Sequence, residues 1–331
     1  MATKKVKSIA QDLRGKHFIV TGANTGIGYA AARELAKMGA KVTLACRSAE
    51  RGKEAIEKIR REALAKQVDE GVDLMNGLED VDVQLEIVDL GSLQSVVAFA
   101  KRFKESGSKV DVLINNAGIM ALPERKETVD GLEMQIGVNH FGGHLLTRLM
   151  VPMIVEGGRI LFTSSDAHRQ LPSMPMTTLD WDNVNFEKPD TYNNWMAYGR
   201  SKLANIFDAK EFAARLSDRN INTYAIHPGV VDTELVRNMT DNSLVSRVVR
   251  VLAPFSKFLL LTPLTGALTT LKCAIDPAIA GPEFSGKYWA SMTEERPSAL
   301  ASNPANPPRY WDLTENILET KLGKKVDELL G

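Results

Sequence analysis

Short apolar runs alternate along the chain with longer segments in which apolar side chains recur every three or four residues. Runs that end at Gly, Pro or Asp predict buried strands, and strands that alternate with helices predict βα units around a parallel sheet. The expected strands are 17–21, 41–46, 83–88, 110–115, 159–164, 221–226 and 287–290. The expected helices are 26–38, 49–65, 92–106, 132–155 and 198–217.

These units form one series with no internal repeat, which predicts a single domain. We therefore expect an α/β fold: one doubly wound, Rossmann-type domain with a mostly parallel, seven-stranded sheet and helices on both faces. The domain should span residues 15–320. An N-terminal arm at 1–14 precedes it and a C-terminal tail at 321–331 follows it.

Three segments interrupt the alternation. Residues 66–82 are acidic and contain glycines, which indicates an exposed excursion. Segments 166–196 and 234–263 each follow an expected strand. Because loops at the carboxyl ends of parallel strands build binding sites, we interpret both as insertions on the substrate side. Segment 234–263 is interpreted as a lid over an apolar pocket, and an amphipathic surface that touches membrane is the alternative.

Composition narrows the function classes. The 331 residues are 44% hydrophobic and 25% charged, values of an ordinary globular protein. Lys plus Arg and Asp plus Glu both number 41, so net charge gives no reason to expect nucleic acid. Two cysteines fit a reducing compartment. No apolar run reaches the roughly 20 residues of a membrane span. We expect a cytoplasmic protein, with organelle import and peripheral membrane contact left open.

A glycine-rich turn follows the first expected strand. Gly22, Gly26 and Gly28 stand where a strand gives way to a helix, with Asn24, Thr25 and Ile27 among them. Glycines let the backbone turn tightly and approach a pyrophosphate closely, and the N–H groups of the helix N-terminus then meet the phosphates. The turn therefore predicts a dinucleotide site. The alternative is that the turn is purely structural, because glycine-rich turns after strands are common in proteins that bind no dinucleotide.

The end of the second strand predicts the cofactor. Dinucleotide folds that prefer NAD place an acid there, about 20 residues on, against the ribose hydroxyls. This chain has Arg47 and Ser48 instead, and a guanidinium can hold a 2′-phosphate. NADP(H) is therefore the expected cofactor and NAD(H) the second choice; the alternative is that Arg47 is a solvated surface residue. Asp89 and Leu90, after the third strand, are expected beside the adenine, and the alternative for Asp89 is an acid at a helix N-terminus.

Tyr198 and Lys202 are four residues apart and share a face of an expected helix. A neighbouring ammonium lowers the pKa of a phenol from its usual value near 10, which suits the phenol to acid–base catalysis. Ser165, with Ser164 as the alternative, can donate a hydrogen bond to a substrate oxygen as charge develops on it. This constellation predicts hydride-transfer chemistry on a carbonyl or alcohol.

Together these motifs resemble the short-chain dehydrogenase/reductase family over roughly residues 15–320. The matching motifs, in order, are Thr21-Gly22-x-x-x-Gly26-Ile27-Gly28, Asn115-Asn116-Ala117-Gly118, Ser165, Tyr198-x-x-x-Lys202 and Pro228-Gly229. Further stretches resemble the retinol dehydrogenases and WW-domain oxidoreductases. These are Gly131 to His140, Ser201 to Ile206, His227 to Leu235, Gly286 to Tyr288 and Tyr310 to Leu313.

The resemblance implies further roles. Asn139 would be a fourth catalytic residue, holding a water that links the lysine to solvent. Asn116, with Ala117 and Gly118, would support the sheet and the adenosine half of the cofactor. Thr233 would contact the nicotinamide carboxamide. Pro228, Gly229 and Val230 would lie nearby, and Tyr198 and Lys202 would contact the cofactor as well as the substrate.

We therefore expect an NADP(H)-dependent oxidoreductase that interconverts a small apolar carbonyl compound with its alcohol, and the resemblance extends this class to retinoid- or steroid-like compounds. The alternative is an NADP-binding regulatory protein with little catalytic role. The resemblance also implies a homodimer. No metal site is expected, because His140, His144 and His168 share no ligand spacing with a carboxylate or cysteine.

Overall fold

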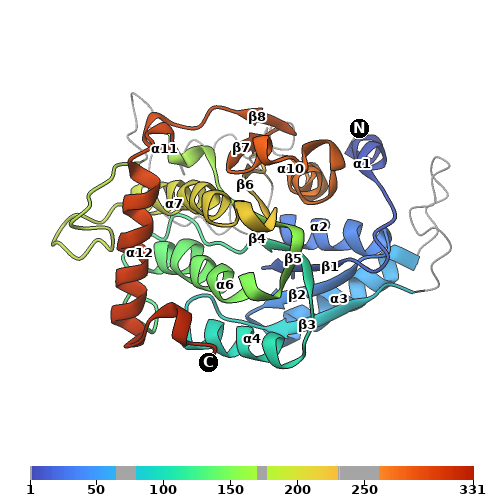
Figure 1. The fold of residues 1–331 in the computed structure, drawn as a ribbon, viewed down its shortest axis with the longest axis horizontal. Helices are drawn as coiled ribbons and strands as arrows, with labels where there is room; N and C mark the ends of the chain where they lie inside the picture. The colour runs from blue at the N-terminus through green and yellow to red at the C-terminus, as the bar shows by residue number, and fades with distance from the viewer. Residues whose placement is uncertain (1, 65–79, 170–176, 230, 232–260) are drawn as a thin grey trace.

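The computed structural model describes residues 2–64, 80–169, 177–229, 231 and 261–331 (Figure 1). One eight-stranded sheet runs through the molecule in the order β3-β2-β1-β4-β5-β6-β7-β8. All neighbours are parallel except the β7–β8 pair. The strands are β1 His17–Thr21, β2 Lys41–Cys46, β3 Val83–Ile87, β4 Val110–Asn115, β5 Ile154–Thr163, β6 Asn222–His227, β7 Lys287–Ala290 and β8 Thr293–Glu295.

The strand order reverses direction between β1 and β4, as a doubly wound fold requires, so the expected α/β class is confirmed. The count differs by one strand. β8 is a three-residue, exposed Thr-Glu-Glu segment that turns back on β7, where Lys287 pairs with Glu294 at 3.3 Å. A polar edge strand this short carries no apolar pattern, and the sequence therefore did not predict it.

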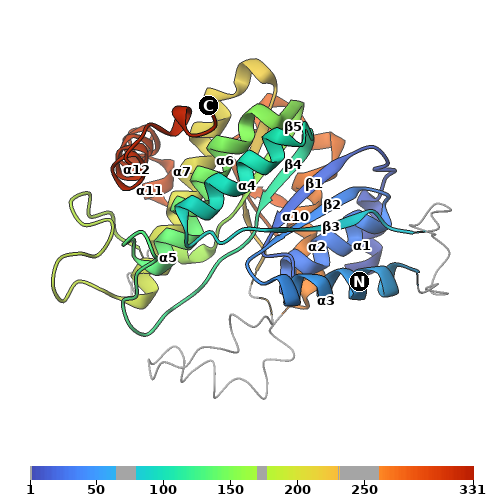
Figure 2. The same cartoon turned by 90° about the horizontal axis from the view of Figure 1, so that it is seen from below.

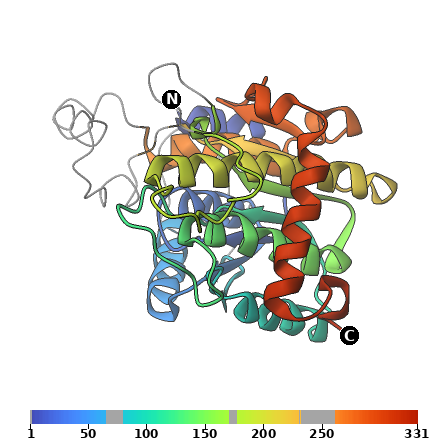
Figure 3. The ribbon, with the colours of Figure 1, turned by 90° about the vertical axis from the view of Figure 1, so that its left-hand side faces the viewer.

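Helices cover both faces of the sheet (Figure 2). One apolar core joins the sheet to α4, α6, α7 and α12, and the other joins it to α1, α2, α3 and α10. Figure 3 shows α12 lying across the α6 and α7 layer. Among the described residues, the α-helices of four or more residues are α1 Ala2–Ile9, α2 Gly26–Lys37, α3 Ala49–Leu64, α4 Leu93–Glu105, α6 Gly142–Met150, α7 Asn194–Arg215, α10 Pro263–Ile275, α11 Ala299–Ser302 and α12 Asn306–Leu322.

Both ends of the chain are more structured than an arm and a tail. Within 1–14, α1 packs against α10, and Val6 and Leu13 are buried. At the other end α12 continues past residue 320, and Val326 is buried in the core beside it. Few residues of each terminal segment are fully buried, and such short segments give too weak a periodicity to indicate packing.

Two boundaries near the site differ from expectation. The helical stretch expected at 132–155 consists of α5 (Met134–Ile136), a π-helical turn η1 (Gly137–Phe141), α6 and a short 3-10 turn, and β5 already begins at Ile154. α7 begins at Asn194 rather than at residue 198, because the Asn193 side chain accepts hydrogen bonds from the N–H groups of residues 195 and 196. Within the described residues, no helix is both long and apolar enough to cross a bilayer.

Candidate active site

The glycine-rich turn and the Asn-Asn-Ala-Gly loop leave neighbouring strands, β1 and β4, and are bound to each other. The N–H groups of Asn116 and Ala117 both donate to Thr21 Oγ1 at 2.9 Å, and Asn116 Nδ2 donates to the Thr21 carbonyl. Gly22 has φ +64°, and a Cβ there would lie 2.9 Å from the Ala117 Cα. Gly28 has no room for a Cβ, which would lie 2.7 Å from the Gly22 carbonyl oxygen. Close backbone approach therefore requires both glycines.

The start of α2 suits a pyrophosphate. Thr25, the residue before the helix, is extended and makes no side-chain cap, so the first N–H groups of α2 lack a capping side chain. Asn24, Gly26 and Ile27 are partly exposed at the same turn. Uncapped N–H groups at the positive end of a helix dipole favour an anion. The turn thus fits the phosphates of a dinucleotide.

The residues expected around the adenosine half lie at the ends of β2 and β3. Arg47 is exposed and makes no ion pair within the described part of the chain. Ser48 Oγ accepts a 3.3 Å hydrogen bond from the Arg51 N–H at the start of α3. Asp89 Oδ1 accepts from the Gly91 N–H at 2.9 Å, so its carboxylate forms a local turn. Leu90 is buried against α6.

The two residues at the centre of the expected chemistry lie on α7 beside the end of β5. Lys202 Nζ lies 5.6 Å from the centre of the Tyr198 ring and donates to the Thr163 carbonyl at 2.9 Å. The Ser165 side chain lies close enough to the Tyr198 phenol to lower its pKa. Ser164 instead donates its hydroxyl to the Lys202 carbonyl at 2.7 Å and is buried. Ser165 is therefore the serine that faces the phenol.

Burial controls the acidity of both groups in the free protein. It raises the pKa of Tyr198 to about 12, and the hydrogen bond from Ser165 opposes this effect. It also lowers the pKa of Lys202 to about 8. The expectation that Lys202 holds the phenol pKa below 10 is therefore not met here. Loss of water penalises the phenolate, and the buried Lys202 ammonium, 5.6 Å from the ring centre, does not outweigh this penalty.

Asn139 lies in the π-helical turn η1 and is almost fully buried. Its Nδ2 donates to the Ile119 carbonyl and to Ser201 Oγ, both at 2.9 Å, and its Oδ1 accepts from the Ile119 N–H. A Cβ on Gly118 would lie 3.2 Å from both Asn139 Oδ1 and Lys202 Nζ. Gly118 therefore brings the loop after β4 against Lys202, so this loop connects the glycine-rich turn with the Tyr198–Lys202 pair.

After β6, Pro228 and Gly229 are partly exposed, and Gly229 has φ +85°. A Cβ on Gly229 would clash with Leu261 at 2.6 Å, so the turn lies against the residues that precede α10. Val230, Thr233 and most of segment 234–263 lie outside the described residues, as do 66–79. Their expected roles stay predictions.

Two neighbours of the site escaped the motif analysis. His168 closes a short turn after Ser165, with its Nδ1 2.6 Å from the Ser165 carbonyl oxygen. Trp195 lies one helical turn before Tyr198, with its ring edge-on at 6.3 Å between centres. The indole Nε1 is buried and has no hydrogen-bond partner in the part of the chain that the structure describes. Neither residue belongs to a recurring sequence motif, so motif analysis could not find it. The only signal was the residue type, a histidine after a strand end and a tryptophan at a helix start.

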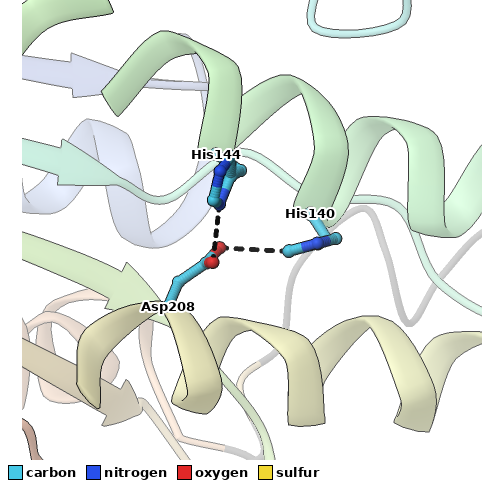
Figure 4. Close-up of side chains that lie close together, drawn as sticks. All are labelled: His140, His144 and Asp208. Atoms are coloured by element: carbon cyan, nitrogen blue, oxygen red, sulfur yellow. Dashed lines mark hydrogen bonds and ion pairs between the residues drawn. The ribbon is translucent and has the colours of Figure 1, made fainter. Parts of the chain in front are cut away.

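His140 and His144 lie beside a carboxylate that spacing could not reveal (Figure 4). His140 Nδ1 and His144 Nδ1 each pair with one oxygen of Asp208 on α7, at 3.0 and 2.7 Å. The three ligand atoms lie within 4.8 Å of one another. However, His144 Nε2 is also held by Glu315 at 2.8 Å, and its pKa is raised to about 9. Both nitrogens of His144 are thus already paired with carboxylates, and we describe the arrangement as a buried ion-pair network.

Comparisons with known proteins agree with this geometry. The family model for short chain dehydrogenases matches residues 16–176. The chain is 38% identical to retinol dehydrogenase 11 of Homo sapiens over 320 residues, 96% of this chain and 90% of that protein. It is 34% identical to the WW domain-containing oxidoreductase of Drosophila melanogaster, over 93% of this chain and 69% of that protein.

Among solved structures, an uncharacterized protein from Mycobacterium paratuberculosis superposes with a TM-score of 0.68 at 27% identity, covering 94% of this chain and 96% of that one. The retinol dehydrogenase and the WW domain-containing oxidoreductase are both more than 30% identical to this chain over nearly its whole length, which establishes common family membership. The chain therefore belongs to the short-chain dehydrogenase/reductase family of nicotinamide-dependent oxidoreductases, in its retinol dehydrogenase-like branch.

Proposed function

We propose that the protein is an NADP(H)-dependent oxidoreductase that interconverts an apolar aldehyde or ketone with its alcohol, with Tyr198 as general acid and base. The observation that carries the proposal is the convergence of Tyr198, Lys202 and Ser165 at the carboxyl end of β5. Gly118 links this group to the loop that packs on the glycine-rich turn of β1. An acid–base group and a dinucleotide turn are thus contiguous.

The choice of NADP rests on Arg47. Its guanidinium is exposed at the end of β2 and makes no ion pair with the residues described, so it is available to a 2′-phosphate. Gly22, Gly26 and the uncapped start of α2 would hold the pyrophosphate. The nicotinamide, when bound, supplies or accepts the hydride. A homodimer and a cytoplasmic location stay predictions.

In the reduction direction Tyr198 donates its phenolic proton to the carbonyl oxygen. A pKa raised to about 12 by burial keeps this proton in place until charge develops on the substrate. Ser165 donates a hydrogen bond to the same oxygen and stabilises that charge. Lys202, whose pKa is lowered to about 8, can return a proton to the phenolate. Asn139 and Lys202 both line the space at Gly118, where a water would connect the lysine with solvent.

The substrate class rests on the relatives and on the apolar side chains near the phenol. The relatives are named retinol dehydrogenases, which suggests a retinoid aldehyde or alcohol as the first compound to test. The Trp195 ring beside Tyr198 suits an apolar ligand. Steroids and simple aldehydes and ketones complete the test panel. Oxidation of NADPH with each compound, followed by absorbance, identifies the best carbonyl substrate.

The decisive variant is Tyr198→Phe, which removes the phenolic proton and little else. We expect kcat to fall by about 10²–10⁴-fold while NADPH still binds. Tyr224→Phe is the matched control, because the Tyr224 hydroxyl donates to the Ile279 carbonyl outside the proposed site. Turnover by Tyr198→Phe equal to that of the control would reject the mechanism. NADPH binding with no turnover of any panel compound by the unaltered protein would favour a regulatory role.

A further inference from the structure

His168 connects the candidate serine to a distant part of the chain. It ends the single 3-10 turn η3 (Asp166–His168) that follows Ser165, and its side chain is fully buried. On its other side lies Ser298, the residue before α11. The ring packs edge-on against Tyr288 of β7, with 4.9 Å between ring centres. A buried imidazole in this position is not used by the mechanism above.

Both ring nitrogens of His168 have a partner, and the two partners define its tautomer. The Ser298 N–H donates to Nε2 at 3.0 Å, so Nε2 carries no proton. Nδ1 must then carry the proton, which it donates to the Ser165 carbonyl at 2.6 Å. Burial lowers the pKa of His168 to about 4, which keeps the ring neutral at physiological pH. The imidazole is thus a fixed bridge between two backbone groups.

The hydrogen bond from His168 holds the Ser165 carbonyl, and the orientation of this peptide group determines where the serine hydroxyl points. Ser165 is extended, and its Oγ accepts from the Ala167 N–H at 3.2 Å. The same side chain is near enough to the Tyr198 phenol to lower its pKa. The turn is further held by Asp166, which accepts from the Tyr288 hydroxyl at 3.0 Å. With the Ser165 carbonyl held by His168, rotation of the peptide that would carry the hydroxyl away from Tyr198 breaks a buried hydrogen bond.

We propose that His168 is a positioning residue for the reaction: through its Nδ1–H it holds the Ser165 peptide so that the serine hydroxyl stays directed at Tyr198 and the substrate oxygen. The inference rests on the proposed function, since it acts through Ser165. It predicts that the Nδ1 side of the ring matters for turnover and that the Nε2 side matters chiefly for packing of residues near 298.

Two substitutions separate the two sides. In His168→Asn the amide nitrogen takes the place of Nδ1 and keeps the donor to Ser165. In His168→Gln the amide oxygen takes the place of Nε2 and keeps the acceptor for Ser298. We expect His168→Gln to lose at least about tenfold in kcat, as when an oxyanion donor is misplaced, and His168→Asn to stay within about threefold of the unaltered protein. The KM for NADPH should change little in either.

The assay is NADPH-dependent reduction of the best carbonyl compound in the panel, with NADPH binding and circular dichroism as checks of folding. The two substitutions are repeated in a Ser165→Ala background, where His168→Gln should cause no further loss of kcat. Equal kcat for the Asn and Gln variants, or additive losses with Ser165→Ala, would overturn the inference. If His168→Gln does not fold, the test rests on His168→Asn. A folded but inactive His168→Asn variant would overturn the inference, and an active His168→Asn variant would support it.

This design distinguishes the inference from the function on which it rests. An active Tyr198→Phe variant would reject the acid–base role, whatever the His168 variants do. Loss of turnover in Tyr198→Phe and Ser165→Ala, together with full turnover in His168→Gln, would leave the function standing and reject the role of His168. Unchanged turnover in Ser165→Ala would also reject it, because His168 would then have no catalytic group to position.

Discussion

The ion-pair network that joins α12 to α6 and α7 makes the stability of this protein depend on pH. His144 is fully buried and lies between two carboxylates, Asp208 Oδ1 at 2.7 Å and Glu315 Oε1 at 2.8 Å. Arg148 also pairs with Glu315, at 3.1 Å. Burial opposes a charged ring, but the two carboxylates outweigh it and raise the pKa of His144 to about 9.

The size and sign of the effect follow from linkage. A histidine pKa raised from 6.5 to about 9 corresponds to about 3 kcal/mol of stability. Because the folded pKa lies above the unfolded one, this stability is fully present below pH 6.5 and is lost as pH rises toward 9. The pKa values of Asp208 and Glu315, both lowered to about 2, arise from the same pairs, so their contributions are not added to it.

The perturbation is Glu315→Gln, which removes one of the two charges on His144 and keeps the shape of the side chain. If the two carboxylates share the effect equally, the variant should be about 1.5 kcal/mol less stable than the unaltered protein near pH 6, from this pairing alone. That difference should shrink toward pH 9.5, where His144 is neutral in both proteins. Asp312→Asn is the control, because Asp312 lies exposed on the same helix.

The assay is urea unfolding followed by tryptophan fluorescence at several pH values between 6 and 9.5. Lys202 contributes a slope of opposite sign above pH 8, because burial lowers its folded pKa, but this contribution is common to all three proteins and cancels in the differences. A Glu315→Gln difference that stays constant over this range, or that matches Asp312→Asn, would refute the reasoning. The protonated His144 would then not hold α12 in place.

Two other substitutions test the cofactor site. Arg47→Asp should shift the ratio of kcat/KM for NADP over NAD toward NAD, because a 2′-phosphate loses its cation and the ribose hydroxyls gain an acceptor; an unchanged ratio would speak against an Arg47–phosphate contact. Gly28→Ala should destabilise the fold and weaken NADPH binding, because the new Cβ would lie 2.7 Å from the Gly22 carbonyl oxygen. Gly143→Ala is the control, because its Cβ would have its nearest contact at 3.7 Å. This variant should be as stable as the unaltered protein, or more stable by up to about 1 kcal/mol. Thermal unfolding and NADPH binding compare the two variants, and equal behaviour would contradict the steric argument.

Local sequence determined the repeating strands and helices, because apolar periodicity reports directly which positions are buried. It also determined the glycine turn and the Tyr198–Lys202 pair, since each depends on residues a few positions apart. Where local signals were weak, boundaries moved. The π-helical turn around Asn139 and the Asn193 cap before α7 are examples, because each depends on the conformation of a single turn.

Only the tertiary structure decided which distant groups meet. Ser165 rather than Ser164 faces Tyr198, because the buried Ser164 hydroxyl donates its hydrogen bond to the Lys202 carbonyl. The pKa of Tyr198 depends on how much water the packed helices leave around the phenol, which no local pattern encodes. Asp208 reaches His144 from another helix for the same reason. Chain neighbours are set by covalent order, whereas ion pairs and desolvation are set by which surfaces the fold brings together.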